Sequence, residues 1–365
     1  MKVCVIYNGA PHYREGIFKL IEKEFDCDWY FGPGYGNIKQ LPLSMFKKAT
    51  LLKRVNLVSA FYWQKGEVGL LLSKKYDVFL ILGESPNLSS FFGMLLHNIF
   101  NRKKKLYTWS HGIRRRLCGI RGIYSSIFNH LPYAIFVYGD YARKYMGEHG
   151  FNSERLFPIH NSLNYDEQIR LRENFTSIYT DHFHNNNPVL FFIGRLTAVK
   201  KLDMIIYAMA ILKKQNILVN CVFIGDGPVK KELELIVSEK KLEAQVWFYG
   251  PCYNEIEKSE LIANADICIA PGNIGLTAMD SLVYGTPAKT MNNFGMQMPE
   301  FESIIPGVTG SFFKENDTND LAKQIAIWLT NGKNREEIRH NCYKVIDEKW
   351  NPNYQIELIK KHLKP

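Results

Sequence analysis

The sequence predicts an α/β protein with two doubly wound, Rossmann-like domains that face a cleft. The chain has 365 residues, more than twice the roughly 150 residues of a typical domain. In both halves, short runs rich in Val, Ile, Leu and Phe alternate with amphipathic helical patterns, as in parallel sheets covered by helices. With 46% hydrophobic and 22% charged residues, the composition excludes collagen-like, coiled-coil and largely disordered classes.

The expected strands divide the chain into two domains, residues 1–163 and 188–345. Residues 164–187 are rich in Arg, Glu, Asn and Asp and are expected to form a linker with some helix, and 346–365 form a last helix. Ligands of such sheets bind beyond the carboxyl ends of the strands, so the loops that leave each strand are candidate sites. The strands are expected at residues 3–7, 77–83, 106–109 and 134–138 in the first domain and at 189–194, 219–224, 246–249, 267–270 and 288–291 in the second.

Positive charge is concentrated in the first half of the chain. The net charge is +10, and residues 1–165 carry 23 Lys and Arg against 11 Asp and Glu, whereas residues 166–365 carry 23 against 25. Such an excess points to an anionic partner: nucleic acid, a membrane surface or a phosphorylated small molecule. The basic run at 102–105 follows an apolar segment, a mixture that suits an anionic bilayer surface, although a solvated basic face explains it equally well. Further basic residues lie at 47–54, 114–116 and 121.

The compartment is also suggested by the sequence. No segment approaches the roughly 18 consecutive apolar residues that a membrane-spanning helix needs, because His97 and Asn98 interrupt the best candidate. The chain starts with a strand pattern and not with the apolar core of a signal peptide. The seven cysteines never form a C-x-x-C pair, so we expect reduced thiols without a disulfide framework or zinc site. These features predict a cytoplasmic protein.

Two loops of the second domain carry residues suited to a diphosphate. The first contains Arg195 and Lys200, whose charges can neutralise a diphosphate as its bond to a sugar breaks. The second leads into a helix that begins near Leu276, where free backbone amides form an anion site. Asp280, about one turn into that helix, can accept hydrogen bonds from two ribose hydroxyls. Surface charges beside a helix start, and an acid favoured by the helix dipole, are the alternative interpretations.

One loop of the first domain adds a candidate residue. His111 follows the strand at 106–109 and can donate a hydrogen bond to a sugar hydroxyl or a phosphate. A single histidine in a loop is more often incidental, and only its position after a strand favours a role. Two further patterns are interpreted as chance. Asp26-Cys27-Asp28 has D-x-D metal-site spacing but lies in an expected edge strand, and Gly32–Gly36 lacks the helix onset of a dinucleotide-binding loop.

Five segments, taken together, resemble a known family. Residues 193–200 read IGRLTAVK, 222–228 read VFIGDGP and 260–287 contain APGNIGLTAMDSL, followed by Pro299-Glu300 and GVTGS at 307–311. In this order and spacing they resemble the retaining glycosyltransferases of family 4, also called glycosyl transferases group 1, which have the GT-B fold. The resemblance covers most of the chain and is strongest from 189 to 313. Residues 8–14, 110–112 and 160–163 match more loosely.

The resemblance implies transfer of a sugar from a nucleotide-diphosphate sugar to an acceptor hydroxyl, with retained configuration, no metal and no cofactor. The first domain would be the acceptor side, the second would bind the donor, and the final helix would pack back on the first domain. Catalytic roles would fall to His111, Arg195 and Lys200. The donor would be bound by Gly9, Gly194, Asn273, Gly275, Leu276, Thr277 and Asp280.

One departure from the family pattern affects the donor. The family usually carries two glutamates eight positions apart, and these positions hold Gly272 and Asp280 here. The first glutamate normally contacts the donor sugar, so the identity of the donor does not carry over. A non-catalytic partner subunit of a glycosyltransferase and a sugar-nucleotide epimerase on the same fold remain alternatives. The epimerase would need additional acid and base carboxylates, which the sequence does not identify.

The resemblance and the charge together suggest the acceptor. We expect a glycan or a lipid-diphosphate-linked oligosaccharide, extended at the inner face of the plasma membrane in cell-surface polysaccharide biosynthesis. Nucleic acid is the least favoured partner, because the basic runs are not interleaved with a recognition helix or an aromatic platform.

Overall fold

The computed structural model divides the chain into two units, which we describe separately. Unit 1 comprises Met1–Asn164 together with Asn351–Pro365, and unit 2 comprises Tyr165–Trp350. The structure describes residues 1–34, 36, 38–116, 118–173, 178–332 and 334–365.

Unit 1 is built on a seven-stranded sheet in which every neighbouring pair is parallel. The strand order is β3-β2-β1-β6-β7-β8-β9, and a separate antiparallel hairpin pairs β4 with β5. The strands are β1 (Lys2–Tyr7), β2 (Asp26–Phe31), β3 (Ala49–Leu51), β4 (Arg54–Asn56), β5 (Tyr62–Gln64), β6 (Val78–Leu82), β7 (Lys105–Ser110), β8 (Ala134–Val137) and β9 (Leu156–Pro158).

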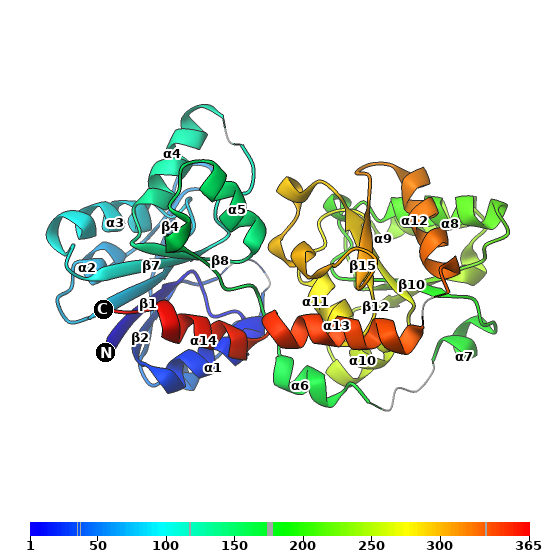
Figure 1. The fold of residues 1–365 in the computed structure, drawn as a ribbon, viewed down its shortest axis with the longest axis horizontal. Coiled ribbons are helices and arrows are strands. Elements are labelled where there is room, and N and C mark those ends of the chain that lie inside the picture. Colours follow the sequence, from blue (N-terminus) through cyan, green and yellow to red (C-terminus); the bar gives the residue numbers. More distant parts are fainter. Residues whose placement is uncertain (35, 37, 117, 174–177, 333) are drawn as a thin grey trace. The chain divides into compact units, whose positions relative to one another are not determined.

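Helices cover both faces of this sheet because its central strands are apolar on both sides (Figure 1). Val3, Val5 and Tyr7 of β1 lie in one buried cluster, whereas Cys4 and Ile6 lie in another. The first cluster contains residues of α1 and α14, and the second contains residues of α2, α3 and α4. The helices of unit 1 are α1 (Glu15–Glu24), α2 (Glu67–Leu71), α3 (Leu88–Phe100), α4 (Gly119–His130), α5 (Asp140–Glu148) and α14 (Pro352–His362).

The C-terminal helix α14 belongs to unit 1. Its Ile356, Ile359 and Leu363 are buried in the same cluster as Ile17 and Phe18 of α1. Gln355 is fully buried; it accepts a hydrogen bond from Ser162 Oγ at 2.6 Å and donates one to the His160 carbonyl at 3.0 Å. Apolar packing and two buried hydrogen bonds therefore attach the end of the chain to its first unit.

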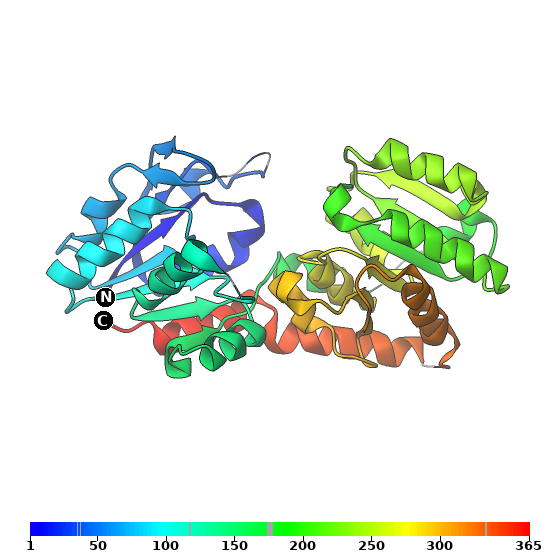
Figure 2. The ribbon, with the colours of Figure 1, turned by 90° about the horizontal axis from the view of Figure 1, so that it is seen from above.

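Unit 2 has a six-stranded parallel sheet of order β12-β11-β10-β13-β14-β15 (Figure 2). Helix α8 packs against α9 and α12, while α11 packs against α6, α10 and α13. The strands are β10 (Val189–Ile193), β11 (Asn220–Ile224), β12 (Val246–Gly250), β13 (Ile267–Ala270), β14 (Ala288–Met291) and β15 (Gly310–Phe313). The helices are α6 (Tyr165–Arg170), α7 (Tyr179–Phe183), α8 (Asp203–Lys214), α9 (Lys230–Glu239), α10 (Glu255–Ala263), α11 (Thr277–Val283), α12 (Thr318–Thr330) and α13 (Arg335–Lys349).

The predicted fold class is confirmed. When only the strands of each parallel sheet are numbered, each sheet begins with the order 3-2-1-4-5-6, which is the order of Rossmann folds. The expectation that residues 25–31 form an edge strand was wrong, because β2 pairs with β1 on one side and with β3 on the other. The three residues of β3 are too short to give a strand signal in the sequence. The stretch expected as a linker contains α6 and α7, both in unit 2.

Among the described residues, no helix is both long enough and apolar enough to span a bilayer.

Candidate active site

The strand order reverses between β10 and β13 in unit 2, and the loops after these two strands carry most of the predicted donor residues. In a doubly wound sheet this reversal opens a crevice at the carboxyl ends of the strands. The loop after β10 is anchored on one side to the turn after β11: Gly194 N–H donates to the Ile224 carbonyl, and Leu196 N–H donates to the Asp226 carbonyl, both at 2.9 Å. A Cβ at Gly227 would lie 2.1 Å from the Leu196 carbonyl oxygen, so this approach requires glycine.

Gly272 holds the other side of the same loop. Its N–H donates to the Lys200 carbonyl at 3.0 Å, and a Cβ added there would lie 2.2 Å from the Val199 carbonyl oxygen and 2.8 Å from Lys200 Cα. Backbone therefore occupies the space that a glutamate side chain would enter at this position. The two loops therefore touch at Gly272, the position where the resemblance leads us to expect a glutamate.

Lys200 links the two loops through its side chain. Its ammonium donates to the carbonyl of Asn273 at 2.7 Å and to Oδ1 of the same residue at 2.8 Å. An ammonium has three donors, so one remains for a ligand. Desolvation lowers the pKa of Lys200, while the negative charge of the buried Glu300 acts in the opposite direction.

Arg195 differs from Lys200 and Lys201 in being exposed. Within the described part of the chain, its guanidinium makes no hydrogen bond or ion pair. Lys201, by contrast, pairs with Glu315 at 3.3 Å and donates to Asn316 Oδ1 at 2.6 Å. Of the three cations in this loop, Arg195 is available to a ligand, and Lys200 has one donor left for a ligand. The ammonium of Lys201 is already bound by Glu315 and Asn316.

The loop after β13 presents backbone donors. Across the described residues, no acceptor is found for the N–H groups of Gly275, Leu276 and Thr277. Thr277 is buried, and its hydroxyl donates to the Ile193 carbonyl at the end of β10 at 2.8 Å. The helix that follows, α11, has only seven residues. The three amides therefore contribute more to anion binding at this loop than a helix dipole does.

Gln297 supports this loop from behind and was not found by sequence reasoning. It is fully buried; its Oε1 accepts from Ile274 N–H at 3.0 Å, and its Nε2 donates to Thr290 Oγ1 at 2.7 Å and to the Met291 carbonyl at 3.1 Å. The residue lies 23 positions from Ile274, and no local pattern marks the contact.

Asp280 belongs to a half-buried polar cluster that the sequence also did not reveal. Its Oδ1 accepts from Lys258 Nζ at 3.0 Å and from Gln168 Nε2 at 3.3 Å. Lys258 also pairs with Glu255 at 2.8 Å, and Glu255 accepts from Tyr284 at 2.5 Å. Both contacts of Asp280 use Oδ1, which leaves Oδ2 without a partner among the described residues. Burial raises the pKa of Asp280, and the charge of Lys258 opposes that rise.

The two predicted residues of unit 1 lie at the carboxyl ends of its strands. Gly9 follows β1, and a Cβ there would lie 2.6 Å from Gly34 Cα. His111 follows β7, keeps contact with solvent and packs against Tyr138, with ring centroids 4.6 Å apart. Desolvation by the surrounding protein, followed by the charges of Arg114 and Arg14, lowers the pKa of His111. We therefore expect a neutral imidazole at neutral pH.

Around His111 the structure gathers a cation and aromatic rings. The buried guanidinium of Arg14 donates to the Tyr138 hydroxyl and lies over the rings of Trp109 and Tyr138, 4.8 and 4.9 Å from their centroids. Stacking on two aromatic faces stabilises a desolvated guanidinium.

A carboxylate lies at the point where the strand order of unit 1 reverses. Glu84, after β6, accepts from Asn8 Nδ2 at 3.0 Å and from the Tyr62 hydroxyl at 2.7 Å. Asn8 lies in the loop after β1, so Glu84 joins the two loops of this crevice much as Lys200 joins those of unit 2.

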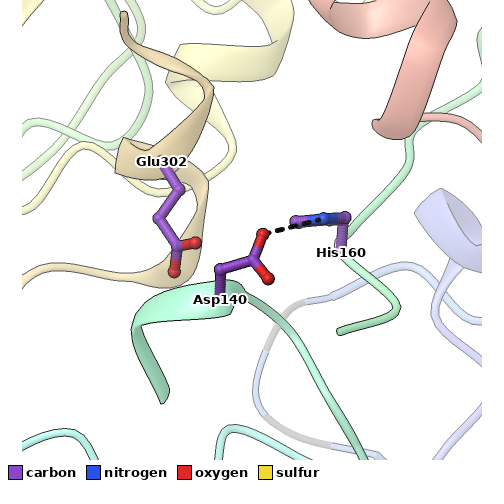
Figure 3. Close-up of side chains that lie close together, drawn as sticks. All are labelled: Asp140, His160 and Glu302. Atoms are coloured by element: carbon purple, nitrogen blue, oxygen red, sulfur yellow. Dashed lines mark ion pairs between the residues drawn. The ribbon is translucent and has the colours of Figure 1, made fainter. Parts of the chain in front are cut away.

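The loosely matching segment at 160–163 places a histidine beside a carboxylate of unit 1. Nε2 of the buried His160 lies 3.7 Å from Asp140 Oδ2 at the start of α5, as Figure 3 shows. His160 has a φ of 55°, in the left-handed region that non-glycine residues seldom adopt.

Comparison with known proteins finds a similar family for part of the chain. Residues 178–345 match the family model of glycosyl transferases group 1. EpsD of Bacillus subtilis (strain 168), which carries the name of a glycosyltransferase, is 28% identical over 179 residues, 48% of this chain and 42% of EpsD. A GDP-mannose-dependent alpha-(1-6)-phosphatidylinositol dimannoside mannosyltransferase of Mycobacterium tuberculosis (strain ATCC 25177 / H37Ra) is 35% identical over 98 residues, 26% of this chain and 25% of that protein. These alignments span less than half the length of either relative.

Similarity to solved structures extends over the chain. The crystal structure of HepE from Anabaena in complex with UDP has a TM-score of 0.75 and 16% sequence identity, covering 100% of this chain and 99% of HepE. At that identity the likeness shows the fold. The chain therefore has the GT-B fold, and its residues 178–345 are similar to the family model of glycosyl transferases group 1.

Proposed function

We propose that the chain is a glycosyltransferase that moves a sugar from a nucleoside-diphosphate sugar to an acceptor hydroxyl with retention of configuration and without a metal. One observation carries the proposal: the two loops at the strand-order reversal of unit 2 carry a guanidinium and three backbone amides without partners among the described residues, and an ammonium with one of its three donors left. This set of donors suits a diphosphate.

In the proposed reaction the bond between the sugar C1 and the diphosphate oxygen breaks, and the bonding electron pair leaves with the diphosphate. Arg195 and Lys200 neutralise the charge that develops there, and the amides of 275–277 bind the phosphate oxygens. The acceptor oxygen attacks C1 from the face that the diphosphate leaves, and its proton passes to the departing phosphate. No enzyme nucleophile is required. A neutral His111 donates a hydrogen bond to the donor sugar or to the leaving group.

Asp280 is proposed to bind the ribose. Lys258 and Gln168 orient its carboxylate through Oδ1, and Oδ2 is left to accept a hydrogen bond from a ribose hydroxyl. Asp280, held by Lys258 and Gln168, thereby distinguishes a ribonucleotide from its deoxy analogue, which lacks that hydroxyl. HepE was crystallised with UDP, and the mycobacterial relative is named as GDP-mannose-dependent, so uridine and guanosine nucleotides are the first donors to test.

The acceptor is proposed to be a glycan on a lipid diphosphate at the inner face of the plasma membrane. The excess of cations in the first half of the chain supports an anionic acceptor or surface on the side of unit 1. Polysaccharide biosynthesis is the pathway class that such an acceptor implies.

A direct test measures binding of UDP, GDP and their sugar conjugates to the purified chain, followed by donor hydrolysis and transfer to a lipid-diphosphate acceptor. We expect sub-millimolar binding of one nucleotide series and slow hydrolysis of its sugar conjugate even without acceptor. Absence of binding to every nucleotide would contradict the proposal. Binding without hydrolysis or transfer would support the alternative of a non-catalytic partner subunit, which the missing carboxylate at Gly272 motivates.

A further inference from the structure

One continuous segment of unit 1 carries cations without any acid. Between Glu84 and Asp140 the sequence contains eight Lys and Arg and no Asp or Glu. The segment includes α3, β7 and α4. The cations are Arg102, Lys103, Lys104, Lys105, Arg114, Arg115, Arg116 and Arg121. A run of this length with a single sign of charge makes the surface above it strongly positive.

Helix α4 within this segment exposes apolar side chains on its outer face. Its inner face buries Ser125, Phe128 and Asn129. On the outer face Ile120, Ile123 and Ile127 are 86%, 63% and 45% exposed. Residues spaced by three and four positions share one face of a helix, so the three isoleucines form a single exposed stripe.

Helix α3 continues the apolar surface beside α4. The two helices are joined by the rings of Phe91 and Tyr124, whose centroids lie 5.0 Å apart, and by a 2.9 Å hydrogen bond from Asn98 to the Leu131 carbonyl. At the end of α3, Ile99 and Phe100 are 64% and 72% exposed, and the basic run at 102–105 follows directly. Both helices lie on the same face of the unit 1 sheet (Figure 1).

We propose that α4, with the adjoining end of α3, is a docking surface for an anionic lipid bilayer. The isoleucines of α4 enter the boundary between headgroups and acyl chains, while Arg116 and Arg121 contact lipid phosphates. This inference rests on the proposed function, because a lipid-linked acceptor places the enzyme at a membrane, and it assigns that contact to one helix. Nucleic acid would leave the isoleucine stripe in water, and pairing of two copies through this face would oppose like charges.

The inference is tested by flotation of the full chain with vesicles of phosphatidylcholine alone and with 30% phosphatidylglycerol. We expect binding to the anionic vesicles that weakens with salt, and little binding to the neutral ones. Variant I120S/I123S should lower partitioning at least tenfold, and R116Q/R121Q should lower it and flatten the salt dependence. The matched controls are L235S/I327S and K231Q/K323Q, which change exposed side chains of unit 2 and should partition like the original chain.

A probe at the start of α4 gives a second measurement. Cys118 is exposed and precedes α4, whereas Cys252 is half-buried and the other five cysteines are buried. In a Cys252→Ser background an environment-sensitive fluorophore on Cys118 should shift to the blue with anionic vesicles only. Equal binding to both vesicle types, no spectral shift, or full binding by I120S/I123S would overturn the inference. A dimer in solution that I120S/I123S dissociates, without vesicle binding, would replace it with self-association.

Nucleotide binding by each variant, measured without vesicles, keeps this inference separate from the proposed function. A variant that loses vesicle binding but still binds nucleotide bears on the docking surface alone. Vesicle binding by a chain that binds no nucleotide would overturn the glycosyltransferase proposal and leave the docking surface standing.

Discussion

The two units share a strand order but differ in the chemistry at the point where that order reverses. In unit 2 the loops after β10 and β13 are joined by the ammonium of Lys200, and Arg195 of the first loop has no partner among the described residues. In unit 1 the loops after β1 and β6 are joined by the carboxylate of Glu84. The sheet supplies the position and the loops supply the charge. A diphosphate suits the first crevice, and a polyhydroxyl acceptor suits the second.

In each half-chain, the side chain that joins the two loops at the strand-order reversal has the opposite sign to the net charge of that half. The first 165 residues carry the excess of 23 Lys and Arg over 11 Asp and Glu, yet an acid joins the loops of their crevice. Residues 166–365 carry 23 against 25, yet cations line theirs. Net charge therefore does not locate the proposed diphosphate site. It locates the surface formed by α3 and α4.

Removal of Arg195, the cation without a partner among the described residues, should have the largest effect on turnover. Arg195→Ala should reduce turnover by more than about a hundredfold, since removal of one charge-stabilising donor costs roughly 10²–10³. Because the side chain is exposed and has no partner in the described chain, thermal stability should not change. Initial rates of donor hydrolysis and a thermal melt measure both.

Lys231→Ala is the control for this charge. Lys231 lies on α9, is exposed and has no described partner, so its removal changes net charge equally. Equal losses in the two variants would mean that general electrostatics, and not contact with the leaving group, governs the rate.

Substitution of Gly272, where the two loops touch, should have the second largest effect, in this case on stability. In Gly272→Ala the new Cβ would meet the Val199 carbonyl oxygen at 2.2 Å, so one loop must move; we expect a loss of about 1–3 kcal/mol in the free energy of unfolding. Urea denaturation measures it. Gly69→Ala is the control, because nothing lies within 4 Å of that Cβ, and α2 should be unchanged or slightly more stable. Gly272→Glu should likewise fail to restore the family pattern; a fully stable variant with higher turnover would contradict the geometry.

Lys258 tests whether the orientation of Asp280 matters. Lys258→Met should reduce the preference for UDP over 2′-deoxy-UDP, or for GDP over 2′-deoxy-GDP, by about tenfold, since hydrogen bonds to charged groups contribute roughly 1.5–3 kcal/mol. Lys258→Arg should retain part of the preference. Binding isotherms with the four nucleotides measure it, and an unchanged preference would remove Lys258 from the site.

The same variant has a pH signature. Burial raises the pKa of Asp280, and Lys258 opposes that rise, so loss of Lys258 should raise it further. Asp280 should then take up its proton at a higher pH than in the original chain, so ribose recognition should be lost at a higher pH as the solution is acidified. Among the described residues, the charged groups that act on Asp280 are Lys258 and Glu255, both on α10. Glu255→Gln in the Lys258→Met background should therefore weaken the pH dependence.

Sequence reasoning found those parts of the fold and site that depend on local pattern. The strands β10 and β13 are apolar throughout, and Arg195, Lys200 and the amides of 275–277 follow them directly. The strands β9 and β15 have three and four residues and are partly exposed, so they leave too little periodicity to detect. Gln168 and Lys258 reach Asp280 from 112 and 22 positions away, and only packing of α6 and α10 against α11 brings them there.

Substitution of Lys201 should have the smallest effect, and the comparison with the adjacent Lys200 makes it informative. Lys201 pairs with Glu315 near the surface, with side chains 32% and 27% exposed, so Lys201→Gln should cost less than about 1 kcal/mol of stability and less still in high salt. A hydrogen bond from Asn293 and then the interaction with Lys201 lower the pKa of Glu315; the pair therefore stabilises the fold above that pKa and ceases to do so as the pH falls through it. Lys201→Gln and the original chain should accordingly converge in stability in acid, and donor turnover should be equal at neutral pH. Lys200→Gln should instead impair turnover, because its ammonium faces Asn273 and the amide loop. Equal turnover defects in both variants would show that the loop binds phosphate through its whole charge and not through the geometry that distinguishes Lys200 from Lys201.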